Sequence, residues 1–209
     1  EIFKERIDEL NIDFKNEIPK ACPYITFVEI EVDKCPSSYS DYLGGFHKNL
    51  NQKRINFFTD VSNYLSYEIG QPTHCYDMDK INDQIKLCET QNKENFYTLT
   101  DKKIVLEDKN IVFMSKNEVI NLAGIMGGKS TACSENTTRI LLECAYFEPR
   151  FIIGKNLKYD LNSDAAHKFE RGVDFGFQDF AIRRFLKIVQ DHANIINVRL
   201  KTFNHKEII

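Results

Sequence analysis

Hydrophobic residues near both ends of the chain recur at the spacing of an α-helix. A helix over residues 2–15 is predicted from four such positions, Ile2, Phe3, Ile7 and Leu10. Weaker patterns predict helices at 37–48, 149–157 and 165–171, and a clear pattern predicts one at 177–193. The buried stripe of this last helix is expected to comprise Phe177, Phe180, Ala181, Phe185, Ile188 and Val189. Another clear helix is predicted at about 57–69, because Asn56 can cap its start and Gly70 and Pro72 can end it.

The middle of the chain has patterns typical of strands. Val28, Ile30 and Val32 alternate with glutamates, which predicts a half-exposed strand. Further short strands are predicted at 85–89, 96–99, 103–106, 111–115, 118–125 and 139–147. The turn at 100–102 suits a hairpin. Helices at both ends around a strand-rich middle predict an α+β fold.

Composition bounds the class of protein. The 209 residues are 42% hydrophobic and 28% charged, which is typical of one large globular domain or two small interleaved ones. No apolar run approaches the ~20 residues that cross a bilayer, so a membrane span is excluded. The first residues are not of signal-peptide type and include no initiator Met, so the chain is expected to be a piece of a longer protein. The net charge of −3 argues against broad, sequence-blind nucleic-acid binding, although it leaves room for a local basic patch.

The six cysteines do not indicate a metal site. No two of them form a CxxC pair, so we expect no structural zinc. Without a signal peptide they are interpreted as reduced cytosolic thiols. They are Cys22, Cys35, Cys75, Cys88, Cys133 and Cys144.

Glu143 does not fit an ordinary strand. Both faces of 139–147 are apolar, which predicts a central strand with Glu143 in the interior. A buried carboxylate needs a cation, a hydrogen-bond donor or a ligand. The alternative is a structural one, in which Glu143 pairs with a lysine or arginine or lies at a sheet edge.

Three further segments carry candidate chemistry, each with a structural alternative. The paired glycines Gly127-Gly128 follow a strand and either let a ligand approach the backbone or form a plain turn. His74 is expected on a loop after a helix end, as a functional or a merely structural histidine. Asp77 could orient its ring or cap the next turn. The polar segment that begins at Ser163 leads into a helix, where Glu170 and Arg171 could form ion pairs.

Taken together and in this order, these segments resemble the editing domain of the β subunit of bacterial phenylalanyl-tRNA synthetase. The family pattern reads Arg-Ser-Ile-Asn, Thr-Asn-Tyr, Gly-Gln-Pro-x-His-Ala-Phe-Asp, Leu-Ala-Gly-x-Met-Gly-Gly, Leu-Leu-Glu-Cys-Ala-x-Phe and Thr-Asp-Ala-Ser-x-Arg-Phe-Glu-Arg-Gly-Val-Asp. The corresponding segments here are 53–56, 62–64, 70–77, 122–128, 141–147 and 163–174. Each motif alone is weak, but in this order and spacing they are specific, and they span roughly residues 22–190.

The resemblance implies a fold and an activity. The fold would be two intertwined β-sheet subdomains flanked by helices, so that residues 1–209 form one module cut from a longer β subunit. The module would hydrolyse tyrosine wrongly attached to the phenylalanine tRNA. The whole enzyme would be a cytoplasmic class II aminoacyl-tRNA synthetase, an α2β2 heterotetramer with ATP and Mg²⁺ at the α subunit. This fragment would need no cofactor or metal and would at most be an ester hydrolase.

The resemblance also assigns roles to residues. His74 would lie beside the ester and the attacking water, and Glu143 would recognise the tyrosine hydroxyl. Gly127 would let the substrate approach the backbone. Ser163 and Ala165 would line the pocket, and Asn63 and Lys53 would form its rim.

Four positions depart from the family pattern and bear on editing efficiency. Lys53 replaces an arginine, and Arg54 could substitute one residue later. Ser163 replaces a threonine, Ala166 a serine and Phe175 a proline. Two alternatives that are not enzymes stay open. One is a non-catalytic tRNA-binding or structural module, and the other is a free-standing tRNA-binding protein of the same fold. Deacylation kinetics would distinguish the first from an editing enzyme, and flanking sequence would identify the second.

Overall fold

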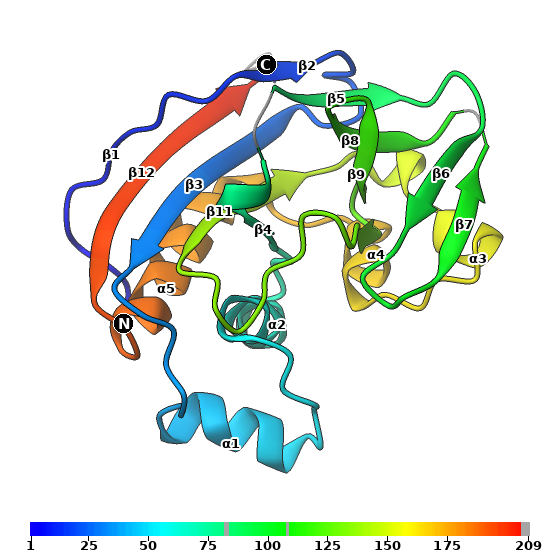
Figure 1. The fold of residues 1–209 in the computed structure, drawn as a ribbon. Coiled ribbons are helices and arrows are strands. Elements are labelled where there is room, and N and C mark those ends of the chain that lie inside the picture. The colour runs from blue at the N-terminus through cyan, green and yellow to red at the C-terminus, as the bar shows by residue number, and fades with distance from the viewer. Residues whose placement is uncertain (82–83, 108, 206–209) are drawn as a thin grey trace.

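Two five-stranded sheets and five α-helices make up the computed structural model, which describes residues 1–81, 84–107 and 109–205 (Figure 1). The first sheet has the strand order β1 (Asp8–Glu9), β12 (Ile195–Asn204), β3 (Tyr24–Val32), β11 (Arg139–Tyr146), β4 (His74–Asp77). The second sheet has the order β10 (Met126–Gly127), β9 (Glu118–Leu122), β8 (Ile111–Ser115), β5 (Ile85–Glu89), β2 (Phe14–Asn16). A separate hairpin pairs β6 (Glu94–Tyr97) with β7 (Lys103–Leu106).

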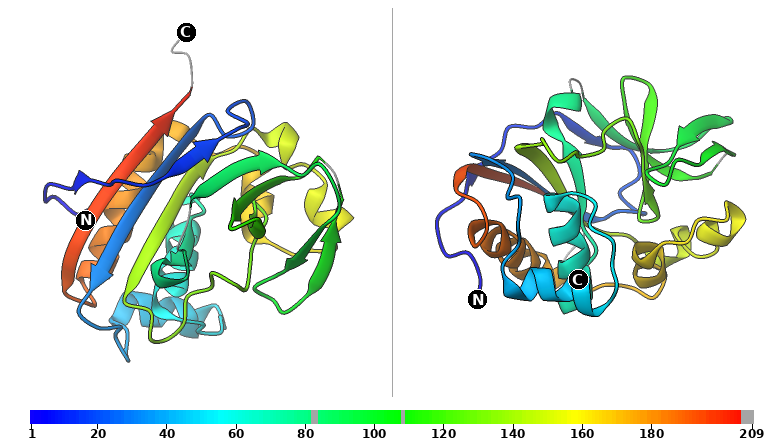
Figure 2. Two further views of the ribbon diagram at one scale, coloured as in Figure 1. Left: turned by 45° about the horizontal axis from the view of Figure 1, so that its top comes forward. Right: turned by 60° about the horizontal axis from the view of Figure 1, so that its bottom comes forward.

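Five α-helices and three 3₁₀ turns accompany the sheets in the described residues. The α-helices are α1 (Asp41–Asn49), α2 (Phe57–Ile69), α3 (Lys155–Lys158), α4 (Asp164–Phe169) and α5 (Gln178–Gln190). Three short 3₁₀ turns are η1 (Met78–Lys80), η2 (Pro149–Phe151) and η3 (Phe175–Phe177). Helices α2 and α5 lie along one face of the first sheet, and the second sheet lies on its other side (Figure 2).

Neither sheet is built from one continuous stretch of chain. The chain passes from β1 in the first sheet to β2 in the second, returns for β3 and β4, forms β5 and β8–β10 in the second, and ends in β11 and β12 of the first. The two sheets are therefore intertwined. This arrangement confirms the predicted α+β class with intertwined sheets and flanking helices.

Two hydrophobic cores meet at the first sheet, which explains why β11 is apolar on both faces. Leu141 and Ala145 belong to the core between the sheets, which we call the inter-sheet core. Ile140, Leu142 and Cys144 belong to the core under α2 and α5. Because β11 pairs with β3 on one side and β4 on the other, the prediction of a central strand is confirmed.

The best-capped helix forms where the sequence predicts it. The Asn56 side chain accepts a hydrogen bond from the Thr59 backbone at 3.0 Å, and Gly70 ends α2 with a left-handed φ of 80°. The predicted strands between 85 and 147 are also present, with ends that differ by a few residues. In the hairpin turn at 100–102, Asp101 has a φ of 61°.

The predicted helix over residues 2–15 is wrong. This segment is extended, and its two most deeply buried side chains serve different cores, Phe3 under α5 and Leu10 between the sheets. Their backbone amides donate to Arg183 and Leu200. The apolar spacing therefore reflects two separate docking points on the body of the protein, and no helical face is formed.

Other differences follow from tertiary packing. The strand expected to be half-exposed, β3, is almost fully buried, since it lies in the middle of the first sheet. Helix 149–157 is wrong because a left-handed Gly154 separates η2 from α3. Phe177 and Phe180 are 37% and 39% exposed and stack on each other, whereas Ile182 and Leu186 complete the buried face of α5. Strand β12 was not predicted at all.

All six cysteines are free thiols. Within the described ranges, none of the helices has both the length and the apolar character that a membrane crossing requires.

Candidate functional site

Glu143 lies in the interior, on the face of the first sheet that looks toward the second sheet. Its register partners are Phe27 on β3 and His74 on β4, and the residue is 5% exposed. The Tyr76 hydroxyl donates to its Oε2 at 2.5 Å, and the Asn121 side-chain amide donates to the same oxygen at 3.2 Å. Among the described residues, Glu143 has no lysine or arginine partner. Strand β11 is flanked by strands on both sides, so Glu143 does not lie at a sheet edge either.

Burial raises the pKa of Glu143 to about 7, and the hydrogen bonds from Tyr76 and Asn121 oppose this rise. The carboxyl group therefore changes charge close to neutral pH. The pKa of Tyr76 is driven far above its ordinary value by burial and by the nearby Glu143 charge. Tyr76 consequently remains a protonated phenol, which donates its hydrogen to the glutamate.

His74 begins β4, so the expectation that it lies on a loop is wrong. The end of α2 is followed by only four residues before the chain joins β11 as an edge strand, and His74 is the first residue of that pairing. Its ring meets the Tyr76 ring edge-on at 4.4 Å between centroids. Burial lowers the pKa of His74 to about 4, so the imidazole is neutral at pH 7. Its Nε2 is buried and has no hydrogen-bond partner among the described residues.

Gly127 lies directly against His74. A Cβ at this position would lie 2.3 Å from His74 Cε1 and 2.8 Å from Leu99 Cδ1. No side chain fits there unless the imidazole moves. Strand β10 of the second sheet therefore contacts His74 of the first sheet, and this close contact is possible because residue 127 is a glycine.

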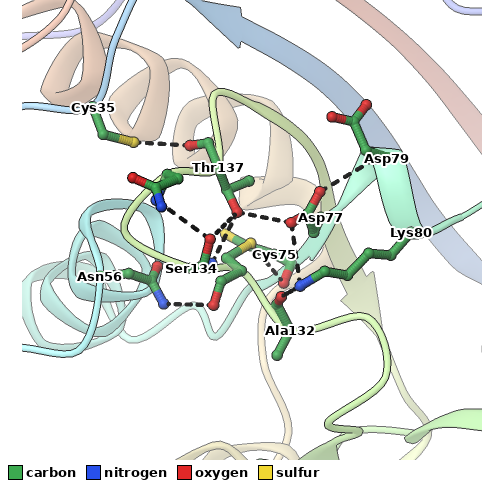
Figure 3. A network of polar contacts seen from close by, with 11 residues as sticks. Cys35, Asn56, Cys75, Asp77, Asp79, Lys80, Ala132, Ser134 and Thr137 are labelled. Atoms are coloured by element: carbon green, nitrogen blue, oxygen red, sulfur yellow. Dashed lines mark hydrogen bonds and ion pairs between the residues drawn. The ribbon is translucent and has the colours of Figure 1, made fainter.

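Asp77 caps the turn that follows β4, the second of its two expected roles. It accepts from the Asp79 backbone at 3.2 Å and from the Thr137 hydroxyl at 2.8 Å, and the Lys80 ammonium lies 3.4 Å away (Figure 3). These hydrogen bonds fix the loop before β11 to the end of β4, and within the part of the chain that the structure describes none of them reaches His74.

Ser163 and Ala165 lie at the start of α4. Ser163 caps the helix by accepting from the Ala166 backbone at 3.2 Å, and Ala165 packs against the inter-sheet core. Lys168 ties α4 to α2 through the Ser66 hydroxyl at 2.8 Å. Within the described residues, no hydrogen bond links Ser163 to His74 or Glu143. Further along, Arg171 and Glu170 form the ion pair that the structural alternative expects.

Lys53 and Asn63 are exposed to solvent. The neighbouring Arg54 has its guanidinium 3.7 Å from the centre of the Tyr39 ring, so it is engaged in a cation–π contact there. The structure therefore gathers His74, Gly127 and Glu143 in one interior cluster. It leaves Lys53 and Asn63 on the surface and Ser163 and Ala165 on a separate helix.

A surface cavity of about 330 Å³ lies between the end of α2 and the segment that follows α4. Gly70, Gln71, Lys168 and Arg171 are among its lining residues, whereas His74, Gly127 and Glu143 are not. This cavity therefore does not open onto the interior cluster.

Two members of the cluster, Tyr76 and Asn121, were not found from the sequence. A signal for Tyr76 was present, because two residues separate it from His74 and side chains alternate along a strand. Interpreting 74–77 as a strand would have placed both rings on the Glu143 face. Asn121 carried no such signal, since only the contact between the sheets brings it to Glu143.

The B3/4 domain family matches residues 30–194, which is most of the chain. This chain belongs to the B3/4 domain family. The chain is 39% identical over 137 residues to the phenylalanine–tRNA ligase β subunit of Neisseria gonorrhoeae, and the match covers 66% of this chain and 17% of that protein. It is 34% identical over 202 residues to the β subunit of Rickettsia bellii, covering 83% of this chain and 23% of that protein.

The matched part is therefore about a fifth of the length of these relatives. A crystal structure of an N-terminal fragment of the phenylalanyl-tRNA synthetase β subunit from Pyrococcus horikoshii has a TM-score of 0.56 to this B3/4 domain. The match covers 95% of this chain and 53% of that one at 10% identity, so it shows a shared fold. The resemblance found in the sequence motifs is confirmed at the level of the family.

Proposed function

We propose that this B3/4 domain is the editing module of a phenylalanine–tRNA ligase β subunit. It would hydrolyse the ester that joins a wrongly attached tyrosine to the phenylalanine tRNA. The β-subunit relatives support the enzyme class. The observation that carries the proposal is Glu143, a buried carboxylate held by neutral donors on the same sheet face as His74.

Glu143 supplies the selectivity in this proposal. A phenol can donate to its carboxylate, whereas a phenylalanine ring leaves the acceptor without that hydrogen bond. A buried acceptor left unpaired costs about 1–3 kcal/mol, which favours the tyrosyl ester. Because the pKa of Glu143 is about 7, this recognition strengthens as the pH rises and the carboxyl ionises.

His74 orients the attacking water or a terminal ribose hydroxyl. Its pKa of about 4 keeps it neutral and makes it a weak base near pH 7, so ordering of the nucleophile is the larger part of its role. Water attacks the ester carbonyl, the bond to the ribose oxygen breaks, and free tyrosine and intact tRNA leave. Gly127 admits the substrate beside the histidine, Ser163 and Ala165 form a wall, and Lys53 and Asn63 form the rim.

The complete enzyme supplies what the B3/4 domain lacks. An α subunit, with ATP and Mg²⁺, would attach the amino acid, and the two subunits would hold the tRNA in a cytoplasmic α2β2 class II synthetase. The domain has a net charge of −3, so it would bind tRNA poorly alone. The editing step itself would use no cofactor or metal.

The decisive measurement is deacylation of tyrosyl-tRNA and phenylalanyl-tRNA by the complete enzyme. Glu143→Ala should slow hydrolysis of the tyrosyl ester about 10- to 150-fold, as expected for a lost hydrogen bond to a charged group. Hydrolysis of the phenylalanyl ester should hold steady or rise. Glu118→Ala, at an exposed glutamate of β9, is the matched control.

His74→Ala should slow editing while phenylalanine attachment stays intact, with His167→Ala as the exposed-histidine control. Equal proportional losses on both esters in Glu143→Ala would place that residue in the chemical step. A large drop in the melting temperature of Glu143→Ala would show that Glu143 has a structural role. An unchanged editing rate in His74→Ala would show that His74 has a structural role.

The second candidate is a non-catalytic module that binds tRNA or supports the enzyme. The observation in its favour is that the cavity beside α4 does not reach His74 or Glu143. Absence of hydrolysis above background in the complete enzyme would support this candidate.

A further inference from the structure

Tyr76, Glu143 and Asn121 form a closed ring of hydrogen bonds. The Tyr76 hydroxyl donates to Glu143 Oε2 at 2.5 Å, and the Asn121 amide donates to both the Tyr76 hydroxyl, at 2.8 Å, and the same carboxylate oxygen, at 3.2 Å. All three residues are buried, and Tyr76 is completely so. Among the described residues, every hydrogen bond to Glu143 ends on Oε2 and none on Oε1.

The contact between Tyr76 and Glu143 is chemically the same as the one that the proposed function requires of the substrate. In both, a tyrosine phenol donates its hydrogen to the Glu143 carboxylate. We propose that Tyr76 is a positioning residue that limits the selectivity of the site for tyrosine, because its hydroxyl already donates to one oxygen of the Glu143 carboxylate that the substrate phenol would meet. This inference rests on the proposed function and concerns how strongly the site distinguishes tyrosine from phenylalanine.

The physical reason lies in what happens to the acceptor when phenylalanine is bound. Discrimination against a substrate that lacks a hydroxyl is large when the buried acceptor is then left unpaired. Here Tyr76 and Asn121 already satisfy one oxygen of Glu143, so phenylalanine leaves the carboxylate only partly unpaired. The incoming phenol would meet the remaining oxygen, whose negative charge is shared with the bond to Tyr76. Both effects reduce the difference between the rates at which the tyrosyl and phenylalanyl esters are hydrolysed.

The ring and the hydroxyl of Tyr76 make separate contacts. The ring packs edge-on against His74, with 4.4 Å between the ring centroids, and only the hydroxyl reaches Glu143. The substitution Tyr76→Phe therefore removes the competing donor and leaves the ring in place.

The test measures kcat/KM for tyrosyl-tRNA and phenylalanyl-tRNA with the complete enzyme. Four forms are compared: the parent, Tyr76→Phe, Glu143→Gln and the double variant. At pH about 8.5, well above the pKa of Glu143, Tyr76→Phe should raise the ratio of the tyrosyl to the phenylalanyl rate by about tenfold. The gain should disappear in the double variant, because it acts through the Glu143 carboxylate. Tyr42→Phe is the control, since Tyr42 donates to Asp191 at 3.1 Å far from this cluster.

A pH profile separates this role from simple packing. The Tyr76 hydrogen bond lowers the pKa of Glu143, so its loss should move the pH at which tyrosine selectivity appears to a higher value. The selectivity of Tyr76→Phe for the tyrosyl ester should then exceed that of the parent at high pH and fall more steeply than that of the parent as the pH decreases to about 6. A merely structural residue would leave the shape of this profile unchanged.

The outcomes are distinct. If the parent hydrolyses the tyrosyl ester but Tyr76→Phe has an equal or lower selectivity at high pH, the inference is overturned and the proposed function stands. If none of the four forms hydrolyses either ester above background, the proposed function fails and the inference fails with it. A thermal melt of each variant, compared with Tyr42→Phe, shows whether any loss of rate comes from unfolding.

Discussion

Two buried glutamates on the same face of the first sheet are stabilised in opposite ways. Glu29 on β3 is 1% exposed and lies between two guanidinium groups, with Arg139 Nε 2.7 Å from Oε1 and Arg199 Nη2 2.7 Å from Oε2. Glu143 on β11 is only two strand positions further along the pairing and is held by neutral donors. Both glutamates stand among apolar neighbours in the sequence.

The difference separates a structural carboxylate from a responsive one. The arginines beside Glu29 reach solvent, with 38% and 39% of their side chains exposed, so charge is compensated at an open end of the sheet. At Glu143 the second sheet covers the site, and burial without a cation raises the pKa to about 7. The first carboxylate is thus compensated by two cations, whereas the second changes charge near neutral pH.

The largest expected effect comes from removing the cations beside Glu29. The double substitution Arg139→Ala with Arg199→Ala leaves a buried carboxylate without compensation and should lower the free energy of unfolding by about 3–5 kcal/mol. Chemical denaturation measures this change. Adding Glu29→Gln to the double variant should recover much of it. A loss of unfolding free energy below about 1 kcal/mol would mean that water compensates the Glu29 charge and that the two arginines are not needed to stabilise it.

A pH series tests the responsive glutamate. Burial raises the pKa of Glu143 from 4.5 to about 7, so the folded protein binds more protons than the unfolded chain between these values. Its contribution to stability is complete below pH 4.5 and is lost as the pH rises to about 7. His74, lowered from 6.5 to about 4, contributes stability that is present above pH 6.5 and is lost as the pH falls to about 4.

These two trends oppose each other in the parent, and Glu143→Gln removes one of them. The unfolding free energy of the variant should therefore rise relative to the parent by about 3 kcal/mol as the pH increases across the interval between the two Glu143 values. Urea denaturation at closely spaced pH values measures the difference. Parallel stability curves for parent and variant would show that Glu143 does not titrate in this range.

Gly127→Ala tests whether the contact between the sheets fixes the histidine. The new Cβ would lie 2.3 Å from His74 Cε1, so the imidazole must move, at a cost of about 1–3 kcal/mol in stability. Editing should slow as well. Gly44→Ala is the control, because Gly44 lies in α1, where alanine favours the helix, and the new Cβ would be 3.6 Å from the Tyr39 backbone oxygen. Equal stability and editing in the two variants would show that the position of His74 is not set by Gly127.

The smallest effects on stability are expected at the surface. Lys53→Ala and Asn63→Ala should change the free energy of unfolding by no more than about 0.5 kcal/mol, because both side chains are exposed. Any loss of tyrosyl-tRNA hydrolysis in these variants would then report contact with the substrate. If neither rate changes, the proposed rim does not include these residues.

The local elements were largely predictable because their signals are local. A cap and a left-handed glycine bound α2, and alternation marks most strands of the second sheet. The same rules failed at residues 2–15, where apolar spacing reflects docking at two places, and at β12, whose exposed and half-buried side chains lack a clear alternation. Phe177 and Phe180 fit a helical stripe, yet they lie beyond the edge of the core and stack on each other.

By itself, the sequence determined the α+β class, the burial of Glu143 and the family, since all three follow from residue order along the chain. Only the tertiary structure decided which donors meet each buried carboxylate. Arg139 and Arg199 reach Glu29 through strand pairing, whereas Asn121 reaches Glu143 from the other sheet. A carboxylate's pKa depends on the charges and solvent around it, and these are set by segments distant in sequence. For this reason two glutamates with similar sequence surroundings acquire different chemistry.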